Sequence, residues 1–358
     1  MRVCILGNSL SSLTLAKALV NQKIYVDQIS QNKSCNINKT RTIGISTSNI
    51  EFFNKKIINI NKILWKLKKI EIYSDNLKNE KLLNFEKNNE YLFSIVKNYK
   101  LIGSLEKNLS KNKYFRKISL KKKFTSFNNY CLVINTEYNN SITKKYFNKK
   151  IEKKYNSFAY TSILEHEKII NNTAVQIFTK FGPLAFLPVS NNETSVVYSV
   201  NKSSITKKIN ISELICKYNF KYRIKKIHSI NSVELKSTIL RSYYYDNILA
   251  FGDLNHKIHP LAGQGFNMTI RDIMNLAKIF EKKINLGLPL DKSINKEFEK
   301  ISKYKNNIYA NGIDLIYEFF NIERKFKNKL LSKTIQILGA NFEINKILTK
   351  FADRGIFK

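Results

Sequence analysis

The segment from Gly252 to Asp272 constrains the fold of this chain more than any other part of it. It reads GDLNHKIHPLAGQGFNMTIRD and follows an apolar run at 247–251. The residue types follow the order of a strand, an acidic turn, a glycine loop and the first turns of an amphipathic helix. Such a junction places backbone N–H groups and a helix dipole beside one carboxylate. It therefore suits a nucleotide-type cofactor that carries both phosphate and hydroxyl groups.

A second signal of this kind opens the chain. Residues 2–6 form a short apolar run typical of a strand, residues 13–22 have helical periodicity, and residues 24–29 form a second apolar strand. A strand, a helix and a strand in this order make the βαβ unit of dinucleotide-binding proteins. The sequence therefore predicts a parallel sheet that starts with residues 2–6.

The loop after the first strand departs from the dinucleotide fingerprint. That fingerprint requires small residues at three positions, which here are Gly7, Ser9 and Ser12, and only the first is glycine. The acidic residue that binds ribose at the end of the second strand is missing, because Ser30 takes its place and Asp27 comes three residues too early. The loop by itself therefore leaves open whether a nucleotide binds here.

Between these two segments the chain changes its periodicity. Residues 157–200 alternate apolar and polar side chains in several runs, which is typical of antiparallel strands. A helix is expected over residues 211–226, and a strand pair over 232–251 leads back to the glycine loop. From residue 268 onward the pattern is mainly helical. We therefore expect an antiparallel sheet between two parts of an α/β domain, followed by C-terminal helices.

The charge of the chain is high, with 62 Lys and Arg against 27 Asp and Glu, which gives a net charge of +35. One interpretation is a polyanionic partner, either nucleic acid or an anionic membrane. The other is compositional drift in an AT-rich genome, since Lys, Asn and Ile are abundant nearly everywhere. The basic residues are spread along the chain and form no clustered arm, which favours drift and argues against a nucleic-acid partner. Attraction to anionic lipid follows from the charge in either case.

The cysteines and the apolar runs indicate the compartment. Cys4, Cys35, Cys131 and Cys216 lie far apart, and no pair has the spacing of a zinc or redox motif. Structural thiols in a reducing compartment are expected. No signal-peptide pattern opens the chain, and no apolar run approaches the roughly 20 residues that span a bilayer. We therefore predict a cytoplasmic protein, either free in solution or peripheral on the inner face of the membrane.

Two histidines within the opening segment raise the question of a metal. His256 and His259 lie three residues apart, but only Asp253 accompanies them as a further ligand type. Metal sites need three or four converging ligands, so turn and packing roles are favoured and no metal site is predicted. His166 and His228 are isolated in the sequence and indicate nothing specific.

The segment at 252–272 resembles the second flavin motif of the flavoprotein aromatic hydroxylases, the family of p-hydroxybenzoate hydroxylase. That motif is GDxxHxxxPxxGQGxNxxxxD, and its positions are filled here by Gly252, Asp253, His256, Pro260, Gly263, Gln264, Gly265, Asn267 and Asp272. The variant HPLAGQGFN is similar to the branch that hydroxylates ubiquinone precursors. Residues 41–46 and 178–188 resemble further segments of that branch, and the stretch from Tyr304 is similar to its C-terminal helices.

The resemblance implies FAD as the cofactor and NAD(P)H as its reductant. Asp253 would hold the ribityl chain, Arg41 would be a positive partner near the flavin, and the backbone of 263–267 would face the ring. The implied cofactor-binding residues are Gly7, Ser9, Ser12, Arg41, Gly252, Asp253, Pro260, Gly263, Gln264, Gly265, Phe266 and Asn267. The implied substrate-binding residues are Phe181, Gly182, Pro183, Leu184 and His259. No catalytic base is predicted.

The departures from the family concern the adenosine end of FAD. The family motif Ala-Asp-Gly-x-x-Ser corresponds here to residues 136–141, where Glu137 replaces the aspartate and Tyr138 replaces the glycine. A bulky Tyr138 obstructs close approach of a phosphate to the backbone unless the loop is rearranged. The flavin end of the motif is kept, whereas the first loop and this middle motif are eroded.

The predicted fold is α/β, with an FAD-binding Rossmann-like βαβ domain, an inserted antiparallel β-sheet substrate domain and a helical C-terminal tail. The predicted divisions are 1–75, 96–155 and 241–285 for the FAD-binding domain, 76–95 and 156–240 for the substrate domain, and 286–358 for the C-terminal helical region.

The function implied by the resemblance is hydroxylation of the ring of a prenylated phenol in ubiquinone biosynthesis, with O₂ and a flavin hydroperoxide. The alternative is a catalytically degenerate member of the family that serves as a structural or lipid-binding subunit of a ubiquinone-biosynthesis assembly. The expected partners are the phenolic substrate, an anionic membrane surface and such an assembly.

Overall fold

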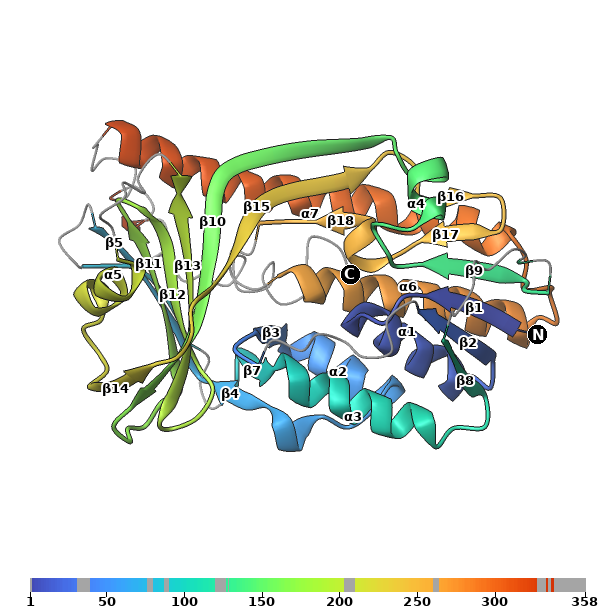
Figure 1. Cartoon of the computed structure of the whole chain (residues 1–358), viewed down its shortest axis with the longest axis horizontal. Helices are drawn as coiled ribbons and strands as arrows, with labels where there is room; N and C mark the ends of the chain where they lie inside the picture. The colour runs from blue at the N-terminus through green and yellow to red at the C-terminus, as the bar shows by residue number, and fades with distance from the viewer. Residues whose placement is uncertain are drawn as a thin grey trace.

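The computed structural model describes residues 2–30, 39–75, 80–86, 90–119, 127, 129–202, 210–259, 264–326, 333, 336 and 337. In Figure 1 a parallel sheet and a larger, mainly antiparallel sheet stand at opposite ends of the long axis, and one long helix runs along both. This arrangement confirms the predicted α/β fold with an inserted antiparallel sheet and helices after it. Within the described residues, no helix is both long and apolar enough to cross a membrane.

The first sheet is built around the N-terminal strand. Its order is β16-β17-β9-β1-β2-β8, and every pairing is parallel except that of β16 with β17. The central strands are buried on both faces, as their continuous apolar runs predict. The strands are β1 (Arg2–Leu6), β2 (Tyr25–Ser30), β8 (Phe115–Ser119), β9 (Leu132–Asn135), β16 (Tyr244–Tyr245) and β17 (Ile248–Ala250).

Helix α1 (Leu10–Asn21) joins β1 to β2 and completes the predicted βαβ unit. It begins at Ser9, whose hydroxyl oxygen accepts a hydrogen bond from the backbone N–H of Ser12 at 3.3 Å. Every residue from Ser11 to Val20 is buried, so this helix lies inside the core. The other helices that pack here are α2 (Thr47–Lys56), α3 (Asn98–Ser110), α4 (Ser141–Tyr146) and α6 (Gly265–Asn285).

The second sheet follows the order β18-β15-β10-β13-β12-β11-β5-β6, with β14 paired to β10. All its pairings are antiparallel except that of β11 with β5. The strands are β5 (Lys69–Ser74), β6 (Lys81–Glu86), β10 (Lys150–His166), β11 (Thr173–Thr179), β12 (Gly182–Pro188), β13 (Glu193–Asn201), β14 (Ile224–Ile227), β15 (Asn231–Leu240) and β18 (His256–Lys257). β5 lies before residue 76, where the predicted substrate domain starts, although it belongs to this sheet.

The two faces of the second sheet bury different clusters. One face, with Ile177, Leu184 and Phe186, packs on helix α5 (Ile211–Tyr218). The helix expected over 211–226 therefore ends eight residues earlier than predicted, where the chain turns into β14. The opposite face, with Ile72 and Phe178, packs on α6 and on the long helix α7 (Ser293–Phe326).

A small three-stranded sheet lies between the two large ones. Its order is β3-β7-β4, formed by β3 (Thr42–Ser46), β7 (Phe93–Lys97) and β4 (Trp65–Leu67). Side chains of β4 and β7 form one cluster with Ile70 and Leu187 of the second sheet. Two short helical turns, η1 (Asn61–Ile63) and η4 (Gly252–Leu254), lie between these strands and helices.

Candidate cofactor and substrate site

The carboxyl ends of β1, β9 and β17 bring together three motifs that lie far apart in the sequence. β1 pairs with β2 on one side and with β9 on the other, so the connections leave the sheet in opposite directions at this point. Ligands of open α/β sheets bind in the crevice at such a switch point. The loop that starts at Gly7, the segment from Thr136 and the turn at Gly252 all follow these strand ends.

Two glycines are required here by close packing. Gly7 has φ +117°, and a Cβ added to it would lie 2.3 Å from Oγ1 of Thr136. Gly252 has φ +67°, and its added Cβ would lie 2.9 Å from Cβ of Ser11 in α1. Each glycine thus lets its strand end approach an element that belongs to another motif.

Ser9 and Ser12 serve the helix α1 in this structure. Ser12 is fully buried, its hydroxyl donates to the carbonyl of Ser9 at 2.7 Å, and its oxygen accepts from Nε2 of Gln28 at 3.3 Å. Ser12 therefore fills the third position of the fingerprint without a clash, because its hydroxyl bonds inward.

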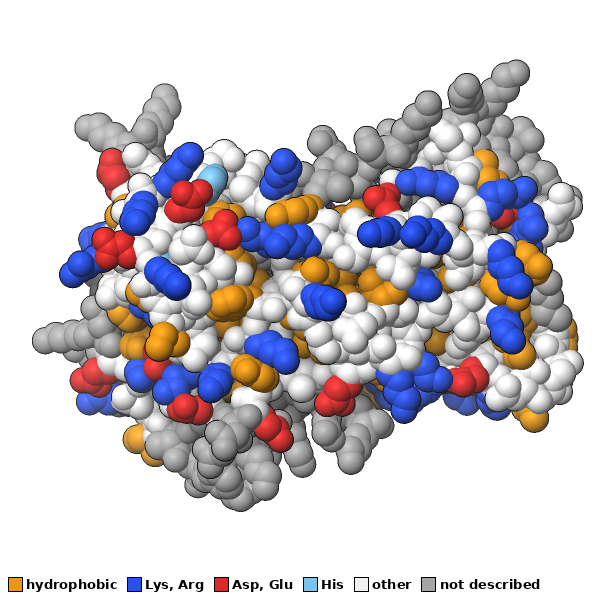
Figure 2. Space-filling view, turned by 90° about the horizontal axis from the view of Figure 1, so that it is seen from below, with side chains coloured by type: hydrophobic (Ala, Val, Ile, Leu, Met, Phe, Trp, Pro, Cys, Tyr) orange, Lys and Arg blue, Asp and Glu red, His pale blue; other side chains and the backbone are white. Residues whose placement is uncertain are grey.

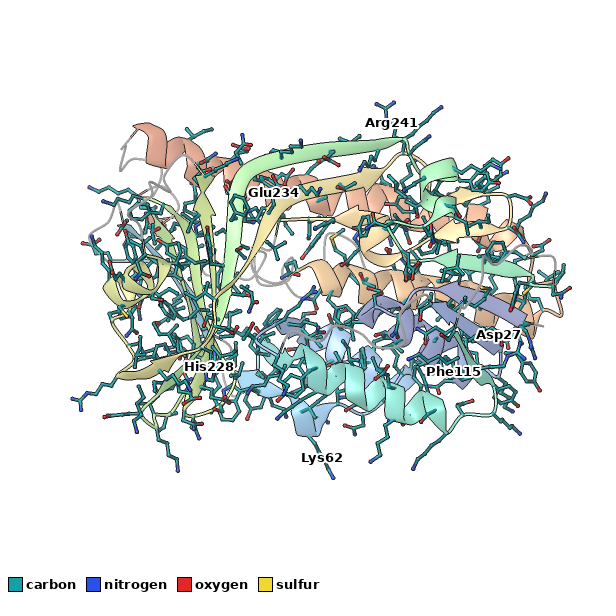
Figure 3. The ribbon with its side chains drawn as sticks, in the orientation of Figure 1. Asp27, Lys62, Phe115, His228, Glu234 and Arg241 are labelled. Atoms are coloured by element: carbon teal, nitrogen blue, oxygen red, sulfur yellow. The ribbon has the colours of Figure 1, made fainter. Side chains whose placement is uncertain are left out.

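Asp27 is a structural ion-pair residue. It is 2% exposed, and Arg116 donates to both of its carboxylate oxygens at 2.7 and 3.1 Å. The hydroxyl of Tyr130 donates to it at 2.9 Å, and burial together with this bond raises the pKa of Tyr130 to about 12. Figure 3 shows Asp27 within the parallel sheet, beside the strand that carries Phe115. Its carboxylate is therefore committed to these partners and takes no part in the crevice.

The turn η4 presents Asp253 at the crevice. Asp253 is exposed, whereas its neighbours Gly252 and Leu254 are buried. The hydroxyl of Tyr138 donates to the backbone carbonyl of Asp253. Burial, with a smaller effect of Asp253, raises the pKa of Tyr138. The residue that replaces the family glycine thus joins the β9–α4 loop to the turn that carries Asp253.

Asn267 anchors the first turn of α6 to the small sheet. It is fully buried, and its side-chain oxygen accepts from the backbone N–H of Ser46 at 3.0 Å and from Asn49 at 2.9 Å. Its Nδ2 donates to the carbonyl of Gly44 at 3.0 Å. β3 begins just after Arg41, which is exposed, so these bonds fix that strand beside the start of α6.

The other residues at the start of α6 divide between packing and open space. Phe266 packs against the main core, and Gln264 is buried. No described atom lies within 4 Å of a Cβ added at Gly265, so there is room beside the first residue of this helix. The predicted cofactor residues Pro260 and Gly263 lie outside the described residues.

His256 and Asp272, the histidine and the last aspartate of the motif, form a buried pair. Nε2 of His256 lies 2.7 Å from Oδ2 of Asp272, and both side chains are 1% exposed. Nδ2 of Asn306 in α7 donates to both oxygens of the same carboxylate at 3.1 Å. These contacts join β18, α6 and α7, which is a packing role of the kind favoured for His256.

His259 lies between aromatic residues of the second sheet and of α7. Its ring centroid is 4.9 Å from that of Tyr155 in β10 and 4.5 Å from that of Tyr317 in α7. It is 1% exposed, and neither ring nitrogen has a hydrogen-bond partner among the described residues. Burial, with a smaller effect of Lys153, lowers its pKa to about 3. The imidazole is therefore neutral at neutral pH.

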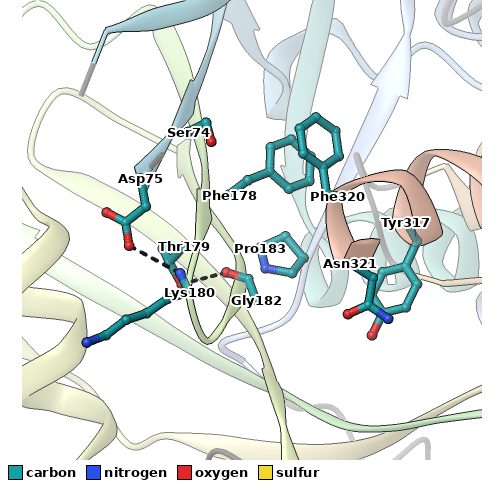
Figure 4. A pocket seen from close by; sticks show the side chains of 10 residues that line it. All are labelled: Ser74, Asp75, Phe178, Thr179, Lys180, Gly182, Pro183, Tyr317, Phe320 and Asn321. Atoms are coloured by element: carbon teal, nitrogen blue, oxygen red, sulfur yellow. Dashed lines mark hydrogen bonds between the residues drawn. The ribbon is translucent and has the colours of Figure 1, made fainter. Parts of the chain in front are cut away.

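A pocket opens between the end of the second sheet and α7. Gly182, Pro183 and Phe178 line it from the sheet, and Tyr317 and Phe320 line it from the helix, as Figure 4 shows. Tyr317 thus contacts both the pocket and the His259 ring.

The predicted substrate residues are split by the alternation of β12. Gly182 and Pro183 line the pocket, whereas Leu184 is fully buried in the cluster around α5, and Phe181 packs against the same cluster. A strand directs successive side chains to opposite faces of a sheet. The sequence pattern predicted the strand but did not say which of its faces meets the pocket.

These residues fit the flavin end of FAD by their chemistry. An exposed carboxylate can accept hydrogen bonds from a polyol, and the space beside Gly265 lies at the positive end of the α6 dipole. The hydrogen bonds between Asn267 and β3 hold the start of β3, which follows Arg41, beside the start of α6. The first and middle motifs meet at the strand ends, where the rest of a dinucleotide would run.

Comparison with known proteins agrees with this geometry. Residues 151–285 match the family described as FAD binding domain. The chain is 29% identical over 154 residues to 3-demethoxyubiquinol 3-hydroxylase of Escherichia coli, which covers 41% of the chain and 39% of that protein. It is 25% identical over 166 residues to ubiquinone hydroxylase UbiL of Rhodospirillum rubrum, which covers 44% of the chain and 39% of the relative. The matches thus span about two fifths of the length of these relatives.

Solved structures share the whole fold. p-Nitrophenol 4-monooxygenase PnpA of Pseudomonas putida superposes with a TM-score of 0.75 over 99% of this chain and 98% of that one, at 10% identity. HpxO of Klebsiella pneumoniae, solved with FAD and uric acid, gives a TM-score of 0.74 over 99% of this chain and 97% of that one, at 11% identity. The domain match supports FAD as the cofactor, the relatives agree with the resemblance to the flavoprotein aromatic hydroxylases, and the solved structures share the fold.

Proposed function

We propose that the chain is an FAD-dependent monooxygenase that hydroxylates the aromatic ring of a prenylated phenol in ubiquinone biosynthesis, with NAD(P)H as reductant. The observation that carries this proposal is the junction at Asp253 and Gly265, which joins the α/β domain to the sheet that bears the pocket. The relatives named as ubiquinone hydroxylases support the substrate class. They do not support the alternative of a non-catalytic subunit.

When bound and reduced, FAD supplies the activation of O₂ and the oxygen transfer. The protein would bind the cofactor and orient it. Asp253 would accept hydrogen bonds from the ribityl hydroxyls, and the start of α6 at Gly265 would place positive dipole charge beside the ring. Arg41 would add positive charge from the start of β3. Gly7 and Ser9 would lie along the nucleotide part.

The substrate would lie between the sheet and the flavin. Gly182 and Pro183 line the pocket, and His259 packs against Tyr317, which lines the same pocket. Because the imidazole of His259 is buried and neutral, it can exchange a hydrogen bond with a phenol without introducing a charge. The helix α7 covers this region and would exclude water.

We also propose a peripheral position on an anionic membrane. Figure 2 shows Lys and Arg side chains spread over one face, with apolar side chains between them. Sedimentation with vesicles of anionic lipid, but not of neutral lipid, should remove the protein from solution at low salt. Equal sedimentation with both would contradict this. Participation in a multiprotein biosynthetic assembly stays a prediction.

The cofactor assignment is tested by titrating the purified protein with FAD and recording the visible spectrum. We expect near-stoichiometric binding and bleaching of the flavin band by NAD(P)H. No binding at saturating FAD would refute the proposal.

The role of Asp253 is tested by Asp253→Ala. Because hydrogen bonds to a charged acceptor contribute about 1.5–3 kcal/mol, the Kd for FAD should rise at least about tenfold. Asp246→Ala is the control, since Asp246 is also exposed and pairs with Lys292 at 3.1 Å. Equal affinities of the two variants would contradict the assignment of Asp253.

A further inference from the structure

A tyrosine of α7 reaches the residue that starts α6. The hydroxyl of Tyr309 donates to Oε1 of Gln264 at 2.6 Å. Tyr309 is 4% exposed and Gln264 is 5% exposed, so the bond lies in the interior. A short bond between buried neutral groups is directional, and it fixes the Gln264 side chain against α7.

This contact uses the Gln264 side chain for a bond to α7, although its position at the start of α6 is one where side chains often cap the helix. Gln264 is the N-cap residue of α6, yet its side chain makes no capping hydrogen bond to the helix. Ser, Thr, Asn and Asp are preferred at such positions because their short side chains cap the first N–H groups. Here the side chain is held by Tyr309, while no described atom lies within 4 Å of a Cβ added at the next residue, Gly265.

The guanidinium group of Arg271 lies over the ring of the same tyrosine. The guanidinium carbon of Arg271 lies 4.4 Å from the centre of the Tyr309 ring. Both terminal nitrogens of Arg271 are buried without a hydrogen-bond partner among the described residues. Buried donors of this kind are rare, and the ring of Tyr309 is a described group that faces this charge. Burial raises the pKa of Tyr309, and the nearby Arg271 opposes this rise.

The three residues lie on one side of the start of α6. Arg271 is seven residues after Gln264, which is two helical turns, and helical side chains point back toward the N-terminus. The positive charge of Arg271 and the positive end of the α6 dipole therefore act in the same region. Positive potential stabilises a flavin that gains negative charge on reduction.

We propose that Tyr309 and Arg271 are positioning residues that hold Gln264 at the start of α6 and thereby raise the reduction potential of the bound flavin. This inference rests on the proposed function, because it concerns FAD at that site. It assigns to α7, far along the chain from the flavin motif, a part in tuning the cofactor.

The test is the reduction potential of the FAD-bound protein, measured against a reference dye. Tyr309→Phe removes the hydroxyl and keeps the ring. We expect the ratio of reduced to oxidised FAD affinity to fall about fivefold, which lowers the potential by about 20 mV for a two-electron couple. Arg271→Met should lower it as well, and Arg271→Lys should recover part of the native value. Tyr304→Phe is the control, because Tyr304 lies five residues earlier on α7 and is 65% exposed.

The outcomes separate this inference from the function beneath it. If the native protein binds FAD and both Tyr309→Phe and Arg271→Met keep the native potential, the inference is wrong and the cofactor assignment stands. If the native protein binds no FAD, the proposed function fails first. Should Tyr309→Phe not fold, a native potential in both Arg271 variants would still overturn the inference.

Discussion

The buried pair of His256 and Asp272 should dominate the stability of the junction between β18, α6 and α7. His256→Ala removes the imidazole that lies 2.7 Å from Asp272, where both side chains are 1% exposed. Asn306 remains as a donor to the carboxylate, at 3.1 Å to each oxygen. Removing one partner of a buried pair costs about 3–5 kcal/mol, and because one donor remains, the expected loss is about 3 kcal/mol.

A second histidine of the same chain provides a matched control. Nε2 of His228 lies 2.5 Å from a carboxylate oxygen of Glu165, but the two side chains are 35% and 43% exposed. Exposed ion pairs contribute about 0–1 kcal/mol, so His228→Ala should cost less than about 1 kcal/mol. The two variants thus differ in burial more than in the chemistry of the pair.

Urea unfolding of both variants, followed by circular dichroism, measures the difference. The midpoint should shift clearly for His256→Ala and little for His228→Ala, with the same slope as the native protein. If His256→Ala loses less than about 1 kcal/mol, the reasoning from burial is refuted. Equal losses for the two variants would refute it as well.

Two further predictions concern packing and pH. Gly7→Ala should lower the free energy of unfolding in urea by more than about 1 kcal/mol, because its Cβ would meet Thr136 and its φ is +117°. Gly103→Ala in helix α3 should instead raise it by about 0.5–1 kcal/mol, because no described atom lies within 4 Å of the added Cβ. The opposite ranking of the two variants would contradict this geometry. His259 has a folded pKa of about 3, below its unfolded value of about 6.5, so its protonation favours unfolding and stability falls as pH drops through that window. His259→Phe should remove up to about 2 kcal/mol of the stability loss between pH 7 and pH 5, measured by urea unfolding at both values, and an unchanged pH dependence would show that the imidazole titrates normally.

Local patterns in the sequence predicted much of the architecture. The opening βαβ unit, the alternating strands of the second sheet and the strand–turn–helix order around Asp253 are local patterns, and the structure contains all of them. The resemblance at 252–272 predicted FAD as the cofactor, which the domain match supports. Boundaries were less predictable, as the end of α5 shows, because a helix ends where its packing partners end.

Site details depended on contacts that no local pattern describes. Asp27 is held by Arg116 and Tyr130, which lie about a hundred positions along the chain. The split of Leu184 from Pro183 depends on which face of the second sheet meets α7.

From its sequence alone, this chain is determined to carry a βαβ unit and a flavin-type junction, because hydrophobic periodicity and glycine placement act over a few residues. The tertiary structure decided which polar groups serve the core and which remain for a ligand. It placed His256 and Asn267 in the scaffold, left Asp253 exposed, and set Tyr309 against Gln264. The physical reason is that a buried polar group must find its partner in space, and the partner is chosen by the packing of helices and sheets whose residues are distant in sequence.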